Sequence, residues 1–206
     1  MKKICVVDYG INNISSICKA LKKIDENYVI VSEANKIKDF SHIILPGVGS
    51  FDSGMRVMKN KGFDTSLREG AINGKFILGI CLGMQLLFNK SEESIDNIDG
   101  LNIIKGTVSK IKIDEINGIY VPHVGWNSIF ESDTNEIDLI QHNEKKDFYF
   151  VNSYYVVPKN KSIIQYYFKH GENYPAIIKE KNVIATQFHP EKSNNGLTIL
   201  KNLCSF

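Results

Sequence analysis

In the first part of the chain, short apolar runs alternate with segments whose apolar positions recur every three or four residues. Residues 2–8 predict a buried strand, and 14–24 repeat apolar positions at helical spacing. Residues 28–31 and 42–45 predict two more strands, with room for a helical turn at 33–40 between them. The chain is therefore expected to open with a strand, a helix and two further strands.

The same alternation continues to about residue 90. Modest helical patterns at 55–59 and 67–72 lead to a strongly apolar run at 76–80, and a helix-like pattern follows at 84–88. Alternating strands and helices predict an α/β fold with a doubly wound, mostly parallel sheet. In such sheets ligands collect at the carboxyl ends of the strands.

Strand-like runs dominate after a polar stretch at 91–100 that reads as a loop. They predict a β-rich second half, closed by a last helix at 197–203. No internal repeat, low-complexity tract or linker divides the sequence, so we expect one domain over residues 1–206. The predicted strands lie within residues 103–113, 119–121, 148–157, 163–168, 176–178 and 183–188.

Composition narrows the class of protein. Hydrophobic content of 43% and charged content of 23% in 206 residues fit an ordinary soluble globular chain. A net charge of +2 with dispersed lysines gives no nucleic-acid footprint. The first three residues run directly into ICVVD, which is too short for a signal or membrane segment. We therefore expect a cytoplasmic protein with no nucleic-acid or membrane partner.

Cys81 stands in a G-x-C-x-G arrangement, the thiol counterpart of a nucleophile elbow. Glycine is expected at 79 and 83 because a Cβ there would collide with neighbouring backbone, or because the turn requires φ values that only glycine adopts readily. A helix starting behind the sulfur would favour a thiolate and an oxyanion. The alternative is an inert core thiol. The remaining cysteines, which show no paired zinc or disulfide spacing, are Cys5, Cys18 and Cys204.

A nucleophilic thiol needs a base, and His189 has the most suggestive neighbours among the five histidines. It ends a strand-like run and precedes Pro190 and Glu191. Residues i and i+2 of an extended segment face the same side, so Glu191 can fix the tautomer of the imidazole and stabilise its charge. A surface turn is the alternative interpretation. The other candidates are His42, His123, His142 and His170.

The segment 46–49, Pro-Gly-Val-Gly, follows the strand predicted at 42–45. Its two glycines allow close backbone approach to a ligand. It fails as a dinucleotide-binding loop, because Asp52 occupies the place of the third glycine. An ordinary turn and an oxyanion-binding strand opposite Cys81 remain as interpretations.

Six segments together resemble the class I glutamine amidotransferases, in order along essentially the whole chain. The cysteine elbow and the HPE segment mark the class, while PHVGWN and LPGVGSF are similar to one branch, the glutaminase subunits of imidazole glycerol phosphate synthases of histidine biosynthesis. The segments are VDYG (7–10), LPGVGSF (45–51), GICLGMQLLF (79–88), PHVGWN (122–127), FYFVNSYY (148–155) and QFHPEKS (187–193).

The resemblance implies a flavodoxin-like fold and hydrolysis of glutamine to glutamate and ammonia through a thioester on Cys81. His189 would carry the proton from the thiol to the leaving ammonia, and Glu191 would orient it. The family also implies an oxyanion hole that a peptide flip completes. The implied oxyanion residues are Val48, Gly49 and Leu82, and the implied glutamine contacts are Gly47, Gln85, Ser153 and Tyr154.

The same resemblance implies a partner and no metal or organic cofactor. The ammonia would pass to a cyclase-type (β/α)8 synthase subunit in a heterodimer, docked through a large apolar and aromatic patch. His123, Trp126 and Asn127 would lie near that partner face and the ammonia exit. For Trp126, the only tryptophan, ordinary core packing is the alternative.

Three positions depart from the family pattern: Asn12, Val124 and Asn152 stand where glycine, methionine and histidine are common. They leave open a relative that supplies ammonia for sugar amination in surface polysaccharide synthesis. Outside the class, a thiol hydrolase of peptides or esters would use the same three side chains. A flavodoxin-like binding module would leave Cys81 inert.

Overall fold

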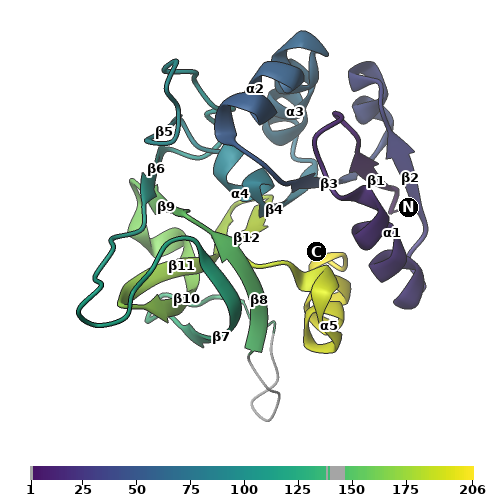
Figure 1. Cartoon of the computed structure of the whole chain (residues 1–206). Helices are drawn as coiled ribbons and strands as arrows, with labels where there is room; N and C mark the ends of the chain where they lie inside the picture. Colours follow the sequence, from purple (N-terminus) through teal and green to yellow (C-terminus); the bar gives the residue numbers. More distant parts are fainter. Residues whose placement is uncertain (1, 138, 140–146) are drawn as a thin grey trace.

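A computed structural model describes residues 2–137, 139 and 147–206, and within them the main feature is a nine-stranded sheet (Figure 1). Its first half is parallel, in the order β2-β1-β3-β4-β12. The inner strands are short and strongly apolar, as expected of strands covered on both faces, whereas the edge strand β2 is partly exposed. Their bounds are β1 Ile4–Val7, β2 Tyr28–Val31, β3 His42–Gly47, β4 Phe76–Cys81 and β12 Val183–Thr186.

The second half of the sheet continues from β12 with antiparallel pairs, in the order β11-β10-β7-β8. A three-stranded sheet, ordered β5-β6-β9, lies beside it. The bounds are β7 His123–Glu131, β8 Asp147–Asn152, β10 Ile164–His170 and β11 Glu172–Glu180, with β5 Lys90–Ser91, β6 Gly106–Lys110 and β9 Tyr154–Pro158 in the smaller sheet.

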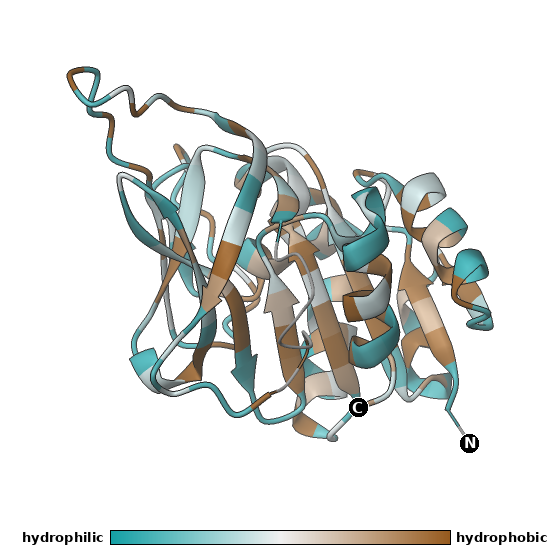
Figure 2. Ribbon diagram, turned by 90° about the horizontal axis from the view of Figure 1, so that it is seen from below, coloured by the Kyte–Doolittle hydropathy of each residue, from teal (hydrophilic) through white to brown (hydrophobic). Residues whose placement is uncertain are grey.

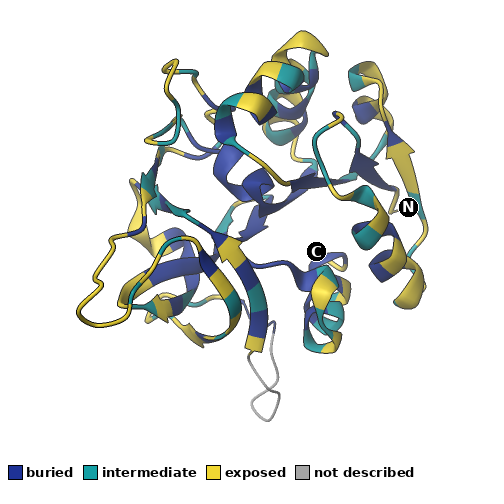
Figure 3. Cartoon of the chain, viewed as in Figure 1, coloured by how far each residue is buried: buried dark blue, intermediate teal, exposed yellow. Residues whose placement is uncertain are grey.

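Helices cover both faces of the parallel half, so the α/β prediction is confirmed (Figure 1). One face packs against α1 (Ile14–Lys23) and α5 (Asn194–Leu203), and the other against α2 (Phe51–Asn60), α3 (Phe63–Ile72) and α4 (Leu82–Leu86). The central strands are apolar in Figure 2 and buried in Figure 3, while the outer helix faces are polar and exposed. Short 3₁₀ helices are η1 Ala34–Asp39, η2 Lys161–Ile163 and η3 Pro190–Lys192.

Several predicted elements of the second half differ in the structure. The strand expected at 119–121 is absent from the described residues, where Ile119 only bridges Asp114. The run at 148–157 is two strands, β8 and β9, which separate at Ser153 and enter different sheets. The strand β7 was not predicted, because its glycine and polar residues interrupt the apolar alternation; pairing with β8 and β10 defines it instead.

No helix in the described ranges is long and apolar enough to cross a bilayer.

Candidate active site

Cys81 is the last residue of β4, and α4 begins at the next residue, Leu82. Its backbone has φ 55° and ψ −112°, a strained conformation for a residue with a side chain. A Cβ on Gly83 would lie 2.0 Å from the carbonyl oxygen of Leu45, and one on Gly79 would lie 3.0 Å from that of Gly83. The predicted collisions are confirmed, whereas the positive φ belongs to Cys81 and not to the flanking glycines.

His189 and Glu191 meet directly behind the end of β12. The Nδ1 atom of His189 lies 2.8 Å from Oε1 of Glu191, and both side chains are buried. The backbone N–H of His189 donates to the carbonyl of Tyr149 in β8, which anchors the segment to the antiparallel half. The predicted contact between residues i and i+2 is therefore confirmed.

The charges around His189 favour its protonated form. Burial lowers the pKa of the imidazole, but hydrogen bonds with Cys81 and Glu191, and the negative charges of both groups, outweigh it and raise the pKa to about 10. The ring therefore carries its proton at neutral pH, between a sulfur and a carboxylate. The site therefore holds an imidazolium between the Cys81 sulfur and the Glu191 carboxylate.

Two buried side-chain amides, those of Gln187 and Gln85, form a hydrogen-bonded pair next to the Cys81 sulfur. Gln187, which is fully buried, directs Nε2 toward the Sγ atom of Cys81 at 3.9 Å. The Nε2 atom of Gln85 donates to Oε1 of Gln187 at 3.2 Å and to the carbonyl of Tyr154 at 3.1 Å. These contacts fix the orientation of the Gln187 amide. Gln187 gives no signal of its own in the sequence, because it lies within a strand-like run.

A cleft of about 290 Å³ opens above Cys81. It collects residues from the ends of β3, β4 and β12 and from the point where β8 passes into β9, which is the expected edge of an α/β sheet. Its walls include eight of the residues singled out from the sequence: Val48, Gly49, Cys81, Leu82, Gln85, Ser153, Tyr154 and His189.

Two further predicted residues lie just behind the cleft wall. Gly47 pairs with Cys81 across β3 and β4, and a Cβ at Gly47 would approach the N atom of Gly83 to 2.7 Å. Glu191 stands behind His189. The α4 helix has only five residues, so the unpaired N–H of Leu82, rather than a long helix dipole, is the donor it offers.

Glu93 also lines the cleft, although its segment reads as a plain polar loop. Its Oε2 atom accepts a hydrogen bond from the N–H of Phe51 at 2.8 Å, at the start of α2. The pKa of Glu93 is raised, because burial and the charge of Asp52 outweigh the hydrogen bond from the Phe51 N–H. Tyr9 is a second residue missed: it is buried near Gly47, and burial and the charge of Cys81 raise its pKa.

The predicted partner residues lie on β7, whose start borders the cleft through Pro122. Trp126 is 59% exposed and packs edge-on against Tyr149, so the core alternative for Trp126 is wrong. Val124 on β7 and Val151 on the paired strand β8 are exposed as well. We call Val124, Trp126 and Val151 the β7–β8 face.

His123, in contrast, is buried between aromatic rings. It stacks on Phe168 and lies 4.3 Å from the ring of His170. Burial and the charge of His170 lower its pKa to about 4, so the ring is neutral at physiological pH. Asn127 donates to the carbonyl of Lys169 and contacts the His123 ring. Of the other histidines considered as bases, His142 lies outside the described residues, and neither His42 nor His170 lines the cleft.

No group of three or more metal-binding side chains gathers in the parts of the chain that the structure describes. The groups that meet at this edge of the α/β sheet are a thiol, an imidazole and a carboxylate.

The family model described as "Glutamine amidotransferase class-I" matches residues 5–204, and the chain belongs to this family. The predicted family is thereby confirmed. Two solved structures have the same fold: one described as a crystal structure of glutamine amidotransferase (TM-score 0.74, 14% identity, 98% of this chain and 99% of the other) and one described as PurLQS from Thermotoga maritima (0.73, 20%, 100% and 99%).

Full-length relatives point to one branch of the family. The chain is 42% identical over 204 residues to imidazole glycerol phosphate synthase subunit HisH 1 of Methanococcus maripaludis, covering 97% of both chains. It is 43% identical over 199 residues to the HisH subunit of Caldanaerobacter subterraneus, covering 96% and 95%. With HisH of Bacillus subtilis the identity is 38% over 198 residues, covering 95% and 92%. The predicted branch agrees with these names.

Proposed function

We propose that the protein is the glutaminase subunit of an imidazole glycerol phosphate synthase, working in the cytoplasm. It hydrolyses glutamine to glutamate and ammonia and passes the ammonia to a cyclase-type (β/α)8 synthase subunit. The observation that carries the proposal is that Cys81 and the buried pair of His189 and Glu191 come together at one cleft, where the sulfur and the carboxylate raise the pKa of the imidazole. The names of the full-length relatives favour this acceptor over sugar amination.

The proposed reaction starts from the charged pair of Cys81 and His189. The sulfur attacks the side-chain amide carbon of glutamine, and the C–N bond breaks as His189 gives its proton to the leaving ammonia. Water then attacks the thioester, with His189 as the base, and the Cys81 sulfur leaves. Glu191 holds the ring in place and balances its positive charge, because it is the buried carboxylate on Nδ1.

The oxyanion in both steps has two sources of donors. We assign one to the N–H of Leu82 and the other to the backbone at Val48 and Gly49 on the facing wall. Gly49 has φ 97°, a conformation that a glycine adopts without penalty. A peptide flip in this loop after β3 would complete the hole when the partner binds.

Glutamine would be recognised by the remaining walls of the cleft. The backbone of Ser153 and Tyr154 and the amide of Gln85 would take up its polar ends, beside the close backbone approach at Gly47. We assign the α-ammonium group to Glu93, the one carboxylate among the residues that line the cleft in the described structure. This assignment adds a residue to those found from the sequence.

The heterodimer would dock through the β7–β8 face. Exposed apolar side chains next to the cleft mouth suit a partner that receives ammonia without releasing it to water. His123 and Asn127 lie behind this face and would support its geometry near the ammonia exit.

The test replaces the sulfur. In a complex with the synthase subunit, Cys81→Ala should abolish glutamine-dependent turnover and leave turnover with ammonium salts intact. Loss of both activities would contradict the division of labour. Glutamine, peptides and simple esters should be compared as substrates of the wild-type protein, because release of ammonia from glutamine alone separates the proposal from a general thiol hydrolase.

A further inference from the structure

The segment 92–98, which carries Glu93 into the cleft, has little regular structure of its own. Its upstream end is fixed to β6, where the Glu92 carboxylate accepts from Lys110 N at 2.7 Å and from Ser109 Oγ at 3.1 Å. Its middle is poorly anchored by apolar packing, since Ile95 is 90% exposed. The position of Glu93 therefore depends on polar contacts.

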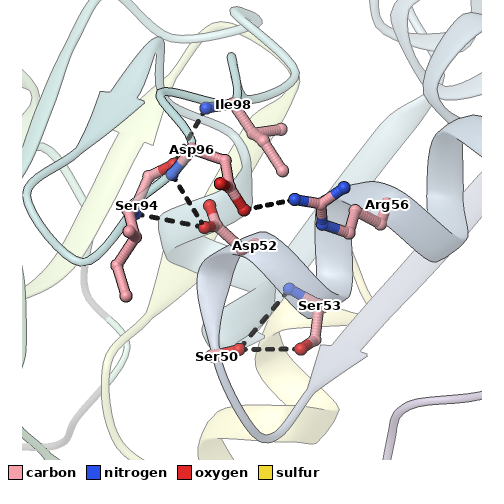
Figure 4. A network of polar contacts seen from close by, with 8 residues as sticks. Ser50, Asp52, Ser53, Arg56, Ser94, Asp96 and Ile98 are labelled. Carbon is pink, nitrogen blue, oxygen red and sulfur yellow. Dashed lines mark hydrogen bonds and ion pairs between the residues drawn. The ribbon is translucent and has the colours of Figure 1, made fainter.

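The first turn of α2 supplies those contacts (Figure 4). The Oδ2 atom of Asp52 accepts from the backbone N–H groups of Ile95 at 3.2 Å and Asp96 at 3.4 Å. Arg56, one turn later in α2, forms an ion pair with the Asp96 side chain. A single carboxylate from the helix thus holds two consecutive peptide groups of the segment.

A contact in the opposite direction completes the arrangement. Glu93 accepts from Phe51 N at 2.8 Å, so each side offers a carboxylate to backbone N–H groups of the other. Phe51 follows directly on the loop 48–50 after β3, which carries Val48 and Gly49. The 92–98 segment is therefore fastened to the start of α2 at Glu93 itself and, just downstream, at Ile95 and Asp96.

From these contacts we propose that Asp52 is a positioning residue for glutamine recognition. By holding the N–H groups of Ile95 and Asp96, it keeps the Glu93 carboxylate at the α-ammonium site of the cleft. It acts through Glu93 and touches neither Cys81 nor His189 within hydrogen-bond distance. The inference rests on the proposed function, because it presumes that the cleft binds glutamine.

Two electrophiles separate this role from a general structural one. A glutamine-analogue diazoketone, 6-diazo-5-oxo-L-norleucine, carries the α-ammonium group of glutamine and alkylates the cysteine with loss of dinitrogen. Iodoacetamide lacks that group, so its rate of reaction with Cys81 reports the reactivity of the thiol without recognition of an amino acid. Mass spectrometry of the intact chain gives, for the diazoketone, both the half-saturating concentration and the limiting rate of labelling.

The main variant is Asp52→Ser, which suits a first helical turn but is too short to reach Ile95 and Asp96. Loss of two hydrogen bonds to a charged acceptor should raise the half-saturating diazoketone concentration by about fivefold to thirtyfold. The limiting rate and the iodoacetamide rate should stay as in the wild type. Asp52→Asn, which keeps an acceptor oxygen at the same reach, should restore binding to within about twofold of the wild type.

Asp64→Ser is the matched control. Asp64 occupies the same place in the first turn of α3 but pairs with Arg68 and has no part in the cleft. Its replacement should leave both labelling reactions unchanged. Glu93→Gln is the positive comparison and should weaken diazoketone binding at least as much as Asp52→Ser.

The inference is overturned if Asp52→Ser binds the diazoketone normally, if both electrophiles slow equally, or if Asp52→Asn is as weak as Asp52→Ser. Should Asp52→Ser fail to fold, the exposed Arg56→Gln replaces it, and an unchanged half-saturating concentration there refutes the role. If the wild type reacts with iodoacetamide but not with the diazoketone, the glutamine assignment itself fails, and the inference falls with it.

Discussion

The elbow that presents Cys81 depends on one backbone contact, which Gly83→Ala would destroy. The added Cβ would lie 2.0 Å from the carbonyl oxygen of Leu45, whereas ordinary contacts begin at about 3.4 Å. Because the obstacle is strand backbone, β3 and α4 would have to separate by about 1 Å or more. Overpacking of this kind costs about 1–3 kcal/mol, and we expect the upper end.

Two measurements follow from that displacement. A loss of about 3 kcal/mol lowers the melting temperature of a chain of this size by about 6–12 °C. Separation of β3 from α4 also shifts Gly47 away from Cys81, and a misplacement of about 1 Å costs roughly a hundredfold in rate. Glutaminase activity at a temperature where the variant is folded should fall accordingly.

Gly70→Ala is the control for this substitution. Its Cβ would meet only side-chain atoms, the nearest being Ile43 Cδ1 at 3.3 Å and Lys75 Cδ at 3.4 Å, in the last turn of α3. Replacement of a helical glycine by alanine gains about 1 kcal/mol of helix propensity, so stability should hold or rise. Wild-type stability and activity in Gly83→Ala would refute the account of the elbow.

Two further predictions concern pH and docking. The pKa of His189 is raised from 6.5 to about 10, so its protonation stabilises the fold below about pH 6.5 and this contribution is lost as the pH rises through 10. The free energy of unfolding of the wild type minus that of His189→Gln, from urea titrations, should shrink over this range; a growing difference would contradict the charge assignment. Trp126→Ala should weaken synthase binding by about 2 kcal/mol or more in calorimetry, with the melting temperature nearly unchanged. Ile72→Ala, which truncates a still more exposed apolar side chain on α3, should leave that affinity intact, and equal losses would argue against the β7–β8 face.

The parallel half of the fold and the reacting groups could be predicted from the sequence because their signals are local. Cys81 lies between two glycines at the end of an apolar run, and Glu191 follows His189 by two residues. Each of these patterns has few structural solutions, and the predicted contacts were found. The apolar strands 28–31 and 42–45 were predicted nearly to the residue for the same reason.

The remainder of the site depends on contacts between distant segments. Glu93 and Asp52 are 41 positions apart in numbering, and neither stands in a periodic pattern that shows where it points. The sequence showed that Asp52 replaces the third glycine of a dinucleotide-binding loop. It did not show that Asp52 binds the N–H groups of Ile95 and Asp96. Likewise β7 could not be predicted, because its pairing with β8 and β10, rather than its own residues, makes it a strand.

The separation of β8 from β9 at Ser153 links two surfaces that otherwise belong to different sheets. Val151 is exposed on the β7–β8 face opposite Val124 and also borders the cleft, which the next three residues line as well; Asn152 donates to the carbonyl of Tyr154 at 3.0 Å. In the proposed heterodimer, a partner on the β7–β8 face would contact Val151, directly next to the peptides that line the cleft. Partner docking and glutamine binding would thus be coupled through the four consecutive residues 151–154.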